Sequence, residues 1–470
     1  MGRKEYRHFF KDKKITLMGL GLLGRGIGVA KFLASNGAKL TITDLKTAKE
    51  LSSSLGELKQ FKNIRYVLGR HRLADFRNCD MVIKAAGVPL NSPHIREAKK
   101  NGISVEMDAS LFAKISQVKI IGVTGTRGKS TVTDIIYRVL NSTGRKVFPG
   151  GNIRGLATLP LLAKVRPGDW VVLELDSWQL QGFGDSKISP HIAILTNFLP
   201  DHLNYYQGSM ERYFNDKANI FKYQTQNDYL IISRQAKSEI KKRFSGEIKS
   251  EIVVAPGKRW PTKLIGEHNQ TNISLAAVLS EVMRIKESAI VKFVENYIGL
   301  PGRMEFVEEL GGIKYYNDTN ATTPSATIVA LNSFKQKVIL IAGGSHKNLD
   351  FSEMAEMIKK KTKALVLITG VGTEKIIKCL GRYPFVLAKN MKEAVEKAQG
   401  FARKGDIILL SPGAASFGVF KNEFDRGEQF NNLVAERRNK EINKNLFKGA
   451  ARTHFIGIGG IGVSGLLGII

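Results

Sequence analysis

The sequence contains almost no cysteine. Its 470 residues include two, Cys79 and Cys379, which lie far apart in the chain. Secreted domains that rely on disulfides, and structural zinc sites, need several closely spaced cysteines. Two distant cysteines supply neither, and this scarcity favours a protein of a reducing cytosol.

Long apolar runs are also missing. The longest charge-free apolar stretch covers residues 455–470; it is rich in glycine and shorter than the ~20 residues that a membrane-spanning helix requires. The first 14 residues are highly charged and lack the apolar segment of a signal peptide. We therefore expect no stable membrane insertion and a cytoplasmic location.

Acidic residues are few relative to basic ones. The chain has 42 Asp and Glu against 72 Lys and Arg, a formal net charge of +30. Clustered basic residues can neutralise nucleic-acid phosphates. Here they are spread along the whole chain without an aromatic-basic RNA motif, so a lysine-rich solvated surface is the simpler interpretation. We expect no nucleic-acid partner, although anionic substrates such as nucleotides would be attracted.

The length predicts about three domains of roughly 150 residues each. Apolar strands alternate with helical patterns along the chain, which is typical of α/β folds with parallel sheets. A new strand pattern begins near residue 116, and the segment Gly299-Leu300-Pro301-Gly302 marks a second change. We therefore predict domains at 1–115, 116–300 and 301–447, followed by a tail at 448–470.

A phosphate-binding loop is the strongest single motif. The segment Gly125-Thr126-Arg127-Gly128-Lys129-Ser130-Thr131 lies between an apolar strand and a helical pattern. Such a loop turns backbone N–H groups toward phosphate oxygens at a helix N-terminus. Lys129 would reach the β- and γ-phosphates and Ser130 would bind Mg²⁺. The alternative is a plain glycine-rich turn, because Val123 occupies the position where the strict motif has glycine.

Candidate metal ligands follow two later strands. Glu174 ends the apolar strand 170–175, and Asp201 and His202 follow the strand 192–195. Ligands gather at the carboxyl ends of parallel strands, and Mg²⁺ takes few carboxylates together with phosphates and water. The alternatives are a solvated strand end for Glu174 and a structural histidine at position 202. From sequence alone, Lys217 resembles an ordinary lysine on a helix surface.

The first unit contains a second glycine-rich turn, Gly19-Leu20-Gly21-Leu22-Leu23-Gly24, with Asp44 about twenty residues later. This is a weak dinucleotide-binding pattern. It keeps open a nicotinamide-dependent oxidoreductase, but that interpretation leaves the segment Gly128-Lys129-Ser130 unexplained.

Taken together, the motifs of residues 14–435 resemble the Mur ligase family. Any one of them is weak to moderate, whereas their order and spacing are specific. Besides the phosphate loop, Glu174 and Asp201-His202, they are Gly151-Asn152-Ile153, Ser177, Asp216-Lys217-Ala218-Asn219, Gly266-Glu267-His268-Asn269 with Asn272, Gly302-Arg303, Asn317-Asp318-Thr319 and Ser411-Pro412-Gly413.

The resemblance implies a three-domain α/β fold. Its N-terminal domain would be Rossmann-like and bind a UDP-sugar, its central domain a P-loop ATPase-like parallel sheet, and its C-terminal domain Rossmann-like. It also implies an ATP- and Mg²⁺-dependent ligase of peptidoglycan precursor synthesis. D-glutamate would be joined to UDP-N-acetylmuramoyl-L-alanine through an acyl phosphate, by a monomer.

The resemblance also assigns residues. Glu174, His202 and Ser130 would hold Mg²⁺, with Lys217 as a fourth ligand in carbamylated form, which reverses the surface interpretation above. The nucleotide would meet the loop 125–131 together with Asn269, Asn272, Arg303 and Asp318. The UDP substrate would meet Leu22, Leu23, Asp44, Gly87, Asn152 and Ser177; D-glutamate would meet Thr322, Lys347, Ser416 and Phe417.

Two positions depart from the family pattern. Lys84-Ala85-Ala86-Gly87 stands where the family usually has Ser-Pro-Gly, and Asn320 stands where many members have lysine. The second departure leaves open a Mur ligase with a different acceptor amino acid. Residues 452–465 resemble the opening of a sister ligase that adds L-alanine to UDP-N-acetylmuramate. We expect this tail to be the remnant of a fused or frame-broken neighbouring reading frame, or of a truncated two-enzyme chain, and to be poorly ordered or packed on the body.

Overall fold

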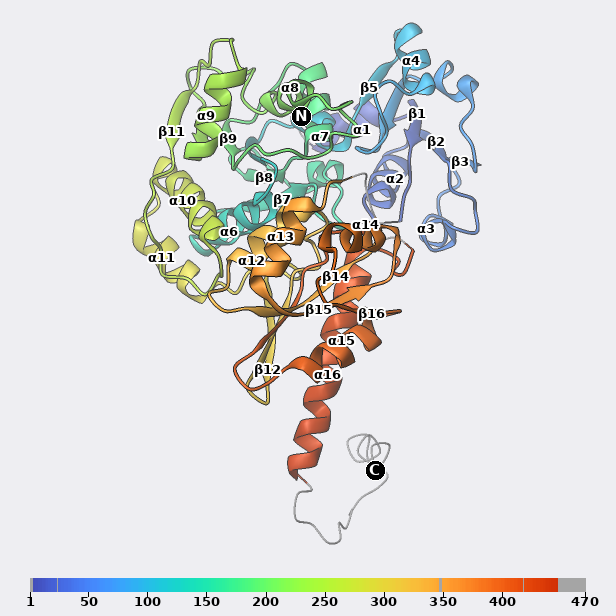
Figure 1. The fold of residues 1–470 in the computed structure, drawn as a ribbon. Helices are drawn as coiled ribbons and strands as arrows, with labels where there is room; N and C mark the ends of the chain where they lie inside the picture. The colour runs from blue at the N-terminus through green and yellow to red at the C-terminus, as the bar shows by residue number, and fades with distance from the viewer. Residues whose placement is uncertain (1–2, 23, 346–348, 417, 447–470) are drawn as a thin grey trace, which may run out of the picture. The chain divides into compact units, whose positions relative to one another are not determined.

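The structure is a computed structural model that describes residues 3–22, 24–345, 349–416 and 418–446 (Figure 1). The predictions for Leu23, Lys347, Phe417 and the tail 448–470 lie outside the described residues. The chain divides into two compact units, Met1–Tyr297 and Ile298–Ile470. None of the helices in the described ranges is both long and apolar enough to cross a membrane.

The first unit begins with a five-stranded parallel sheet in the order β3-β2-β1-β4-β5. Its central strands are almost entirely buried, as expected when helices cover both faces of a parallel sheet. The strands are β1 (Lys14–Met18), β2 (Lys39–Asp44), β3 (Ile64–Leu68), β4 (Met81–Lys84) and β5 (Ser104–Glu106). The helices are α1 (Arg3–Phe10), α2 (Arg25–Ser35), α3 (Ser52–Gly56), α4 (Pro93–Lys100) and α5 (Asp108–Ile115), with a 3-10 turn, η1 (Leu73–Phe76).

A second parallel sheet in the same unit has six strands in the order β11-β10-β9-β6-β8-β7. These strands are β6 (Lys119–Thr124), β7 (Val147–Gly151), β8 (Trp170–Glu174), β9 (Ile192–Leu195), β10 (Tyr229–Ile232) and β11 (Glu251–Val254). The helices are α6 (Lys129–Ser142), α7 (Ser177–Asp185), α8 (Met210–Ala218), α9 (Arg234–Arg243), α10 (Glu267–Val282) and α11 (Glu287–Asn296), with a 3-10 turn, η2 (Leu159–Ala163).

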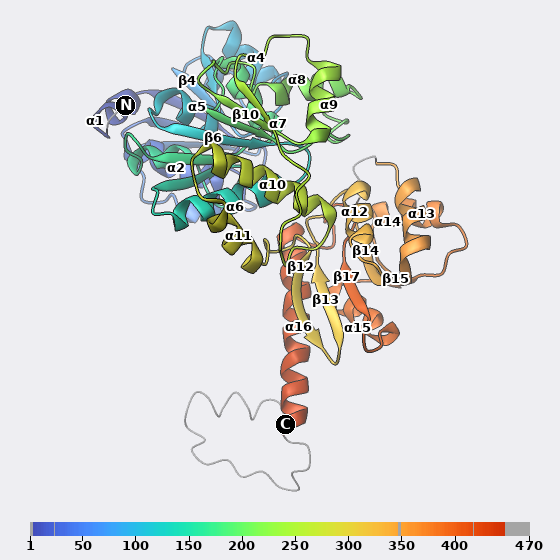
Figure 2. The same ribbon diagram turned by 90° about the vertical axis from the view of Figure 1, so that its left-hand side faces the viewer.

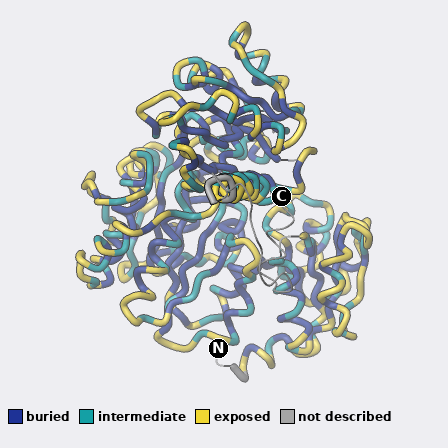
Figure 3. The backbone as a smooth tube through the Cα atoms, turned by 90° about the horizontal axis from the view of Figure 1, so that it is seen from below, coloured by how far each residue is buried: buried dark blue, intermediate teal, exposed yellow. Residues whose placement is uncertain are grey.

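Alternation along the strands builds a core on each face of this second sheet. Successive side chains of a strand point to opposite faces. In β8, Val172 packs with side chains of α6 and α10, whereas Val171 and Leu173 pack with side chains of α7 and α8. Figure 2 shows α6 and α10 lying close together. Figure 3 shows buried backbone in the interior and exposed backbone at the outer turns.

The two sheets of the first unit share one apolar core. Leu17 and Ile42 of the first sheet belong to the same buried cluster as Val171 and Leu173 of the second. The Asp108 carboxylate also accepts hydrogen bonds from the backbone N–H groups of Thr158 and Leu159, both at 2.7 Å. The predicted boundary at residues 115 and 116 falls at the end of α5 and remains a prediction.

The second unit contains a six-stranded sheet in the order β12-β13-β17-β14-β15-β16. Among its described strands, only β12 and β13 pair antiparallel. They form a hairpin through Gly311 and Gly312, which both have the positive φ that a tight two-residue turn requires. The strands are β12 (Glu305–Leu310), β13 (Ile313–Asn317), β14 (Val338–Gly343), β15 (Thr362–Ile368), β16 (Val386–Ala388) and β17 (Ile407–Leu410). The helices are α12 (Pro324–Asn332), α13 (Ser352–Lys361), α14 (Val371–Leu380), α15 (Met391–Phe401) and α16 (Glu423–Leu446). The predicted α/β class with parallel sheets is confirmed.

Candidate active site

The phosphate loop joins β6 to α6 and is enclosed on two sides. Gly125 has φ +142° and Gly128 has φ +83°, conformations that side chains with a Cβ rarely adopt. A Cβ on Gly125 would lie 1.9 Å from Thr196 Oγ1, and one on Gly128 would lie 2.3 Å from Asn272 Oδ1. The loop therefore needs glycine at both positions for space as well as for conformation.

Asn197 holds the loop from the neighbouring strand β9. Its backbone carbonyl accepts a hydrogen bond from Thr126 N at 3.0 Å, and its side-chain carbonyl accepts one from Arg127 N at 2.9 Å. Thr196 Oγ1 donates to the Arg127 carbonyl at 2.5 Å. The Lys129 ammonium donates to the carbonyls of Gly125 and Thr126, both at 3.1 Å. Loop and lysine thus form one hydrogen-bonded unit at the N-terminus of α6, whose first turn also contains Ser130 and Thr131.

Lys217 enters the site from α8, and the interpretation of it as a surface lysine is wrong. Its side chain is buried, and its Nζ donates to the Gly125 carbonyl at 2.9 Å and to Thr124 Oγ1 at 3.3 Å. The Nζ also lies 5.1 Å from the centre of the Tyr213 ring. Burial and the nearby charge of Lys129 hold the pKa of Lys217 well below its usual value. The site thus disfavours the charged form of this lysine at the base of the phosphate loop.

Glu174 ends β8, the strand next to β6, and is buried. Asn152, after β7, donates its backbone N–H to the Glu174 carbonyl at 2.6 Å. Ser177 starts α7 three residues later, where Asp176 and Gln179 form a capping box. The carboxyl ends of β7, β8, β6 and β9 thus bring these residues to one edge of the sheet.

Asp201 and His202 occupy the loop after β9. Asp201 Oδ2 lies 3.6 Å from Arg127 Nη1 and 3.8 Å from His202 Nε2. Burial raises the pKa of Asp201, but the charge of Arg127 and the hydrogen bond from the His202 backbone N–H help to outweigh it, so the pKa is lowered overall. The carboxylate is therefore engaged with Arg127, a pairing that the sequence did not indicate.

The centre of the His202 ring lies 4.8 Å from that of Trp178, with the two rings tilted by 55°, and His202 has a positive φ of 53°. Burial, together with the charges of Lys217 and Lys129, lowers the pKa of His202 against the opposing effect of Asp201. A neutral imidazole is the form that binds a metal. Within the described residues, no three or more His, Cys, Asp and Glu side chains gather closely enough to hold a metal ion by themselves.

The two asparagines predicted for the adenine side lie on α10 and are buried. Asn272 Nδ2 donates to Asn269 Oδ1 at 3.0 Å, and Asn269 Nδ2 donates to the Ile265 carbonyl at 2.8 Å. Because Asn272 Oδ1 faces Gly128, the structure brings this pair against the phosphate loop.

The glycine-rich turn of the first sheet meets the loop that contains Asn152. Arg25 Nη2 donates to Asn152 Oδ1 at 2.8 Å, and a Cβ on Gly24 would lie 3.2 Å from Gly155 Cα. The predicted UDP-side residues of the first and second sheets are therefore neighbours. Arg25 was missed from sequence, although a cation at the start of a helix after a glycine-rich turn could have suggested it.

Asp44 stabilises that turn directly. Its Oδ2 accepts from the backbone N–H groups of Leu20 and Gly21 at 2.9 and 3.1 Å, and its Oδ1 accepts from Lys46 N at 2.9 Å. Leu22 is exposed beside the turn. Both carboxylate oxygens of Asp44 thus accept from backbone N–H groups, and Oδ2 braces the glycine-rich turn.

Gly87 follows β4 in the segment that departs from the family pattern. Lys84, at the end of β4, is buried, and its Nζ donates to the Val88 carbonyl at 2.9 Å. Burial lowers the pKa of Lys84 to about 8. The lysine thus closes the loop 84–88 by a side-chain contact.

In the second unit, the predicted residues follow β13 and β17, which are adjacent. Asp318 accepts from Ser411 Oγ at 2.9 Å and from Met304 N at 3.2 Å, next to the exposed Arg303. Thr322 is half-buried and Ser416 is buried in the loops after the same two strands. Asn320 donates to the carbonyls of Gly302 and Pro301 at 3.0 and 3.3 Å, so it braces a turn.

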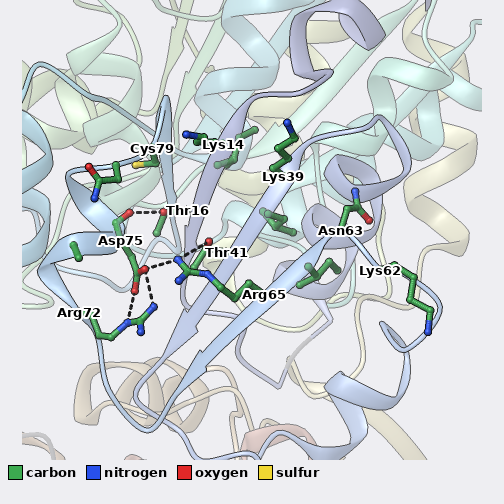
Figure 4. Close-up of a pocket in the computed structure, with 15 residues that line it drawn as sticks. Lys14, Thr16, Lys39, Thr41, Lys62, Asn63, Arg65, Arg72, Asp75 and Cys79 are labelled. Atoms are coloured by element: carbon green, nitrogen blue, oxygen red, sulfur yellow. Dashed lines mark hydrogen bonds and ion pairs between the residues drawn. The ribbon is translucent and has the colours of Figure 1, made fainter.

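A separate hollow of about 700 Å³ lies at the other end of the first sheet, where β1, β2 and β3 begin (Figure 4). Arg65 and Arg72 turn toward Asp75 there, at 2.5 and 2.9 Å. The hollow lies at the starting ends of the strands, remote from their carboxyl ends, and is therefore separate from the candidate site.

A phosphate loop at the carboxyl edge of a parallel sheet, surrounded by an acid, a histidine and a buried lysine, defines a nucleotide-binding α/β enzyme. Comparison with protein families narrows this class. Residues 13–106 match the "Mur ligase MurD-like, N-terminal domain", residues 123–259 the "Mur ligase middle domain" and residues 302–413 the "Mur ligase, glutamate ligase domain". The chain belongs to the Mur ligase family, which confirms the resemblance.

Curated relatives cover nearly the whole chain. UDP-N-acetylmuramoylalanine--D-glutamate ligase of Roseiflexus sp. (strain RS-1) is 35% identical over 90% of this chain and 98% of the relative. The protein of the same name from Borreliella burgdorferi is 36% identical over the same shares.

Solved structures share the fold. UDP-N-acetylmuramate-alanine ligase MurC from Thermotoga maritima has a TM-score of 0.58 at 18% identity, covering 91% of this chain and all of that one. MurF ligase from the same organism, in complex with ADP, has a TM-score of 0.57 at 16% identity, covering 93% and 97%.

Proposed function

We propose that the protein joins D-glutamate to UDP-N-acetylmuramoyl-L-alanine, with cleavage of ATP to ADP and phosphate, in peptidoglycan precursor synthesis. The observation that carries the proposal is the convergence of Lys129, Glu174 and Lys217 on one phosphate loop, in a chain about 35% identical to ligases of that name. As a cytoplasmic monomer it would meet ATP and the nucleotide-sugar in the same compartment.

The first chemical step forms an acyl phosphate. A carboxylate oxygen of the UDP-linked substrate attacks the γ-phosphorus of ATP, and the bond to the β-γ bridging oxygen breaks to release ADP. Lys129 and the N-terminus of α6 offset the negative charge that spreads over the phosphoryl oxygens. We assign Thr131, Asn269 and Asn272 to the nucleotide as well. Arg303 and Asp318 stay predicted nucleotide contacts on the strength of the family resemblance.

The second step forms the amide. The amine of D-glutamate attacks the acyl carbon, and the tetrahedral intermediate collapses with loss of phosphate. Because the acyl phosphate is already activated, holding the amine close to the acyl carbon accounts for much of the rate of this step. We assign the amino acid to Thr322, Lys347, Ser416 and Phe417, and the UDP substrate to Leu22, Leu23, Asp44, Gly87, Asn152 and Ser177.

The residues present fit a magnesium ion that is held mainly by substrate phosphates. Glu174, Ser130 and His202 offer one carboxylate, one hydroxyl and one imidazole whose lowered pKa keeps it neutral. Such an ion polarises phosphoryl oxygens when bound. Burial lowers the pKa of Lys217 and so favours the neutral amine, which is the form that reacts with CO₂. The resulting carbamate would add an anionic ligand.

The test is a phosphate-release assay with UDP-N-acetylmuramoyl-L-alanine, ATP and Mg²⁺ and a panel of amino acids. We expect phosphate release with D-glutamate and none from the Lys129→Ala variant, which would show that the released phosphate comes from this site. The panel of amino acids is needed because Asn320, which stands where many family members have lysine, leaves the acceptor amino acid open. Release with another amino acid but not with D-glutamate would refute the acceptor assignment.

A further inference from the structure

Arg426 is a charged side chain without any solvent exposure. It lies near the start of α16 and is the largest of the fully buried side chains. Arginine rarely occurs in a protein interior unless it is paired, because removing its charge from water is costly. Its contacts therefore need a physical explanation.

The guanidinium of Arg426 joins two loops at the carboxyl edge of the second unit's sheet. Its Nε donates to Thr319 Oγ1 at 3.1 Å and its Nη2 to the Thr319 carbonyl at 2.7 Å. Its Nη1 donates to the Ala414 carbonyl at 3.1 Å. Thr319 follows β13 and Ala414 follows β17, so one planar group fixes the separation of two loops.

A third loop lies next to the same group. A Cβ built on Gly344, directly after β14, would lie 3.6 Å from Arg426 Nη1. β13, β17 and β14 are consecutive in the sheet. Arg426 therefore contacts the loops after β13 and β17, which carry the proposed acceptor residues Thr322 and Ser416, and lies next to Gly344 at the end of β14.

The helix that carries Arg426 is itself fastened to the first of these loops. Thr319 Oγ1 donates to the Glu423 carbonyl at 2.8 Å. Asn317 Nδ2 donates to the Gly427 carbonyl at 3.1 Å and to Asn431 Oδ1 at 2.8 Å. Three further hydrogen bonds thus join the start of α16 to the end of β13 and the loop that follows it.

The charge of Arg426 is not offset by a contacting acid. Burial lowers its pKa to about 10, while Glu423 and Asp318 raise it from a distance, so the group stays protonated at neutral pH. Among the residues that the structure describes, no carboxylate makes an ion pair with it. The cation therefore adds positive potential to the loops around it.

We propose that Arg426 is a positioning residue for the acceptor amino acid: it sets the spacing of the loops after β13 and β17, and its charge favours a dicarboxylate acceptor. This inference rests on the proposed function. It explains why a costly buried cation occurs where three loops of the sheet edge converge.

The test compares the kinetics of Arg426→Met and Arg426→Lys in the full chain. For Arg426→Met we expect a rise of at least tenfold in KM for D-glutamate, with kcat within threefold and the KM for the UDP substrate unchanged. Arg426→Lys keeps the charge but not the planar fork, so its KM should rise less. A purely structural role predicts fewer active molecules, and hence a lower kcat with unchanged KM values.

Arg438→Met is the matched control. Arg438 lies on the same helix but is exposed, with Glu308 at 3.4 Å, so the KM values of this variant should equal those of the wild type.

A KM for D-glutamate within twofold of wild type in Arg426→Met would overturn the proposal. Equal KM values in the Met and Lys variants would overturn the part played by charge. If Arg426→Met does not fold, Arg426→Lys decides: a rise of at least threefold supports the proposal and no rise overturns it. Absence of turnover in the wild type would instead refute the proposed function.

Discussion

Substitution of Gly128 by alanine tests the close contact between the phosphate loop and α10. Gly128 has φ +83°, and a Cβ there would lie 2.3 Å from Asn272 Oδ1. The left-handed conformation alone costs a residue with a Cβ about 1–2 kcal/mol. The contact adds to this cost, because Asn272 must move away and lose its hydrogen bond to Asn269. Leaving buried amide groups unsatisfied costs roughly 1–3 kcal/mol.

Gly144, just after α6, provides a matched control. It has φ +77°, and a Cβ there would meet no other atom within 4 Å, so Gly144→Ala should carry the conformational cost alone. We therefore expect Gly128→Ala to lower the free energy of unfolding by about 2 kcal/mol more than Gly144→Ala does. The KM for ATP should rise in Gly128→Ala and stay unchanged in the control.

Urea unfolding followed by tryptophan fluorescence suits this measurement, because the three tryptophans, Trp170, Trp178 and Trp260, all belong to the first unit. In an Asn272→Ala background the obstructing side chain is absent, and Gly128→Ala should then cost no more than Gly144→Ala. Equal losses of stability in the two single glycine variants, or a full extra cost in the Asn272→Ala background, would refute the steric argument.

Two further predictions concern buried lysines. Lys217→Ala should lose turnover on the order of 10²-fold and regain part of it with acetate or formate, whereas the exposed Lys222→Ala should not change; wild-type turnover in Lys217→Ala would remove its proposed metal role. The pKa of Lys84, lowered by burial to about 8 from 10.5, means that the unfolded chain binds this proton more tightly. Stability should therefore rise with pH between about 8 and 10.5, by up to about 3 kcal/mol. Lys84→Met should lack this part of the rise, and parallel pH curves of urea unfolding would contradict the prediction.

Local motifs explain why much of the fold was predictable. Apolar strands followed by glycine-rich turns and helices require parallel sheets covered by helices, and all three sheets follow that pattern. The hairpin β12–β13 was not predicted, although Gly311 and Gly312 between two strand-like segments could have indicated it. The phosphate loop was recognised because its glycines and Lys129 are contiguous in the chain.

The sequence by itself therefore determined the fold class, the family motifs and the position of the phosphate loop, since each depends on residues close together in the chain. Tertiary structure alone decided which distant side chains meet. Lys217 reaches Gly125, Arg127 lies near Asp201, and Arg426 joins the loops of Thr319 and Ala414. Burial, which lowers the pKa of Lys217 and encloses the Arg426 guanidinium, arises only when separate elements pack against one another, and no local pattern encodes it.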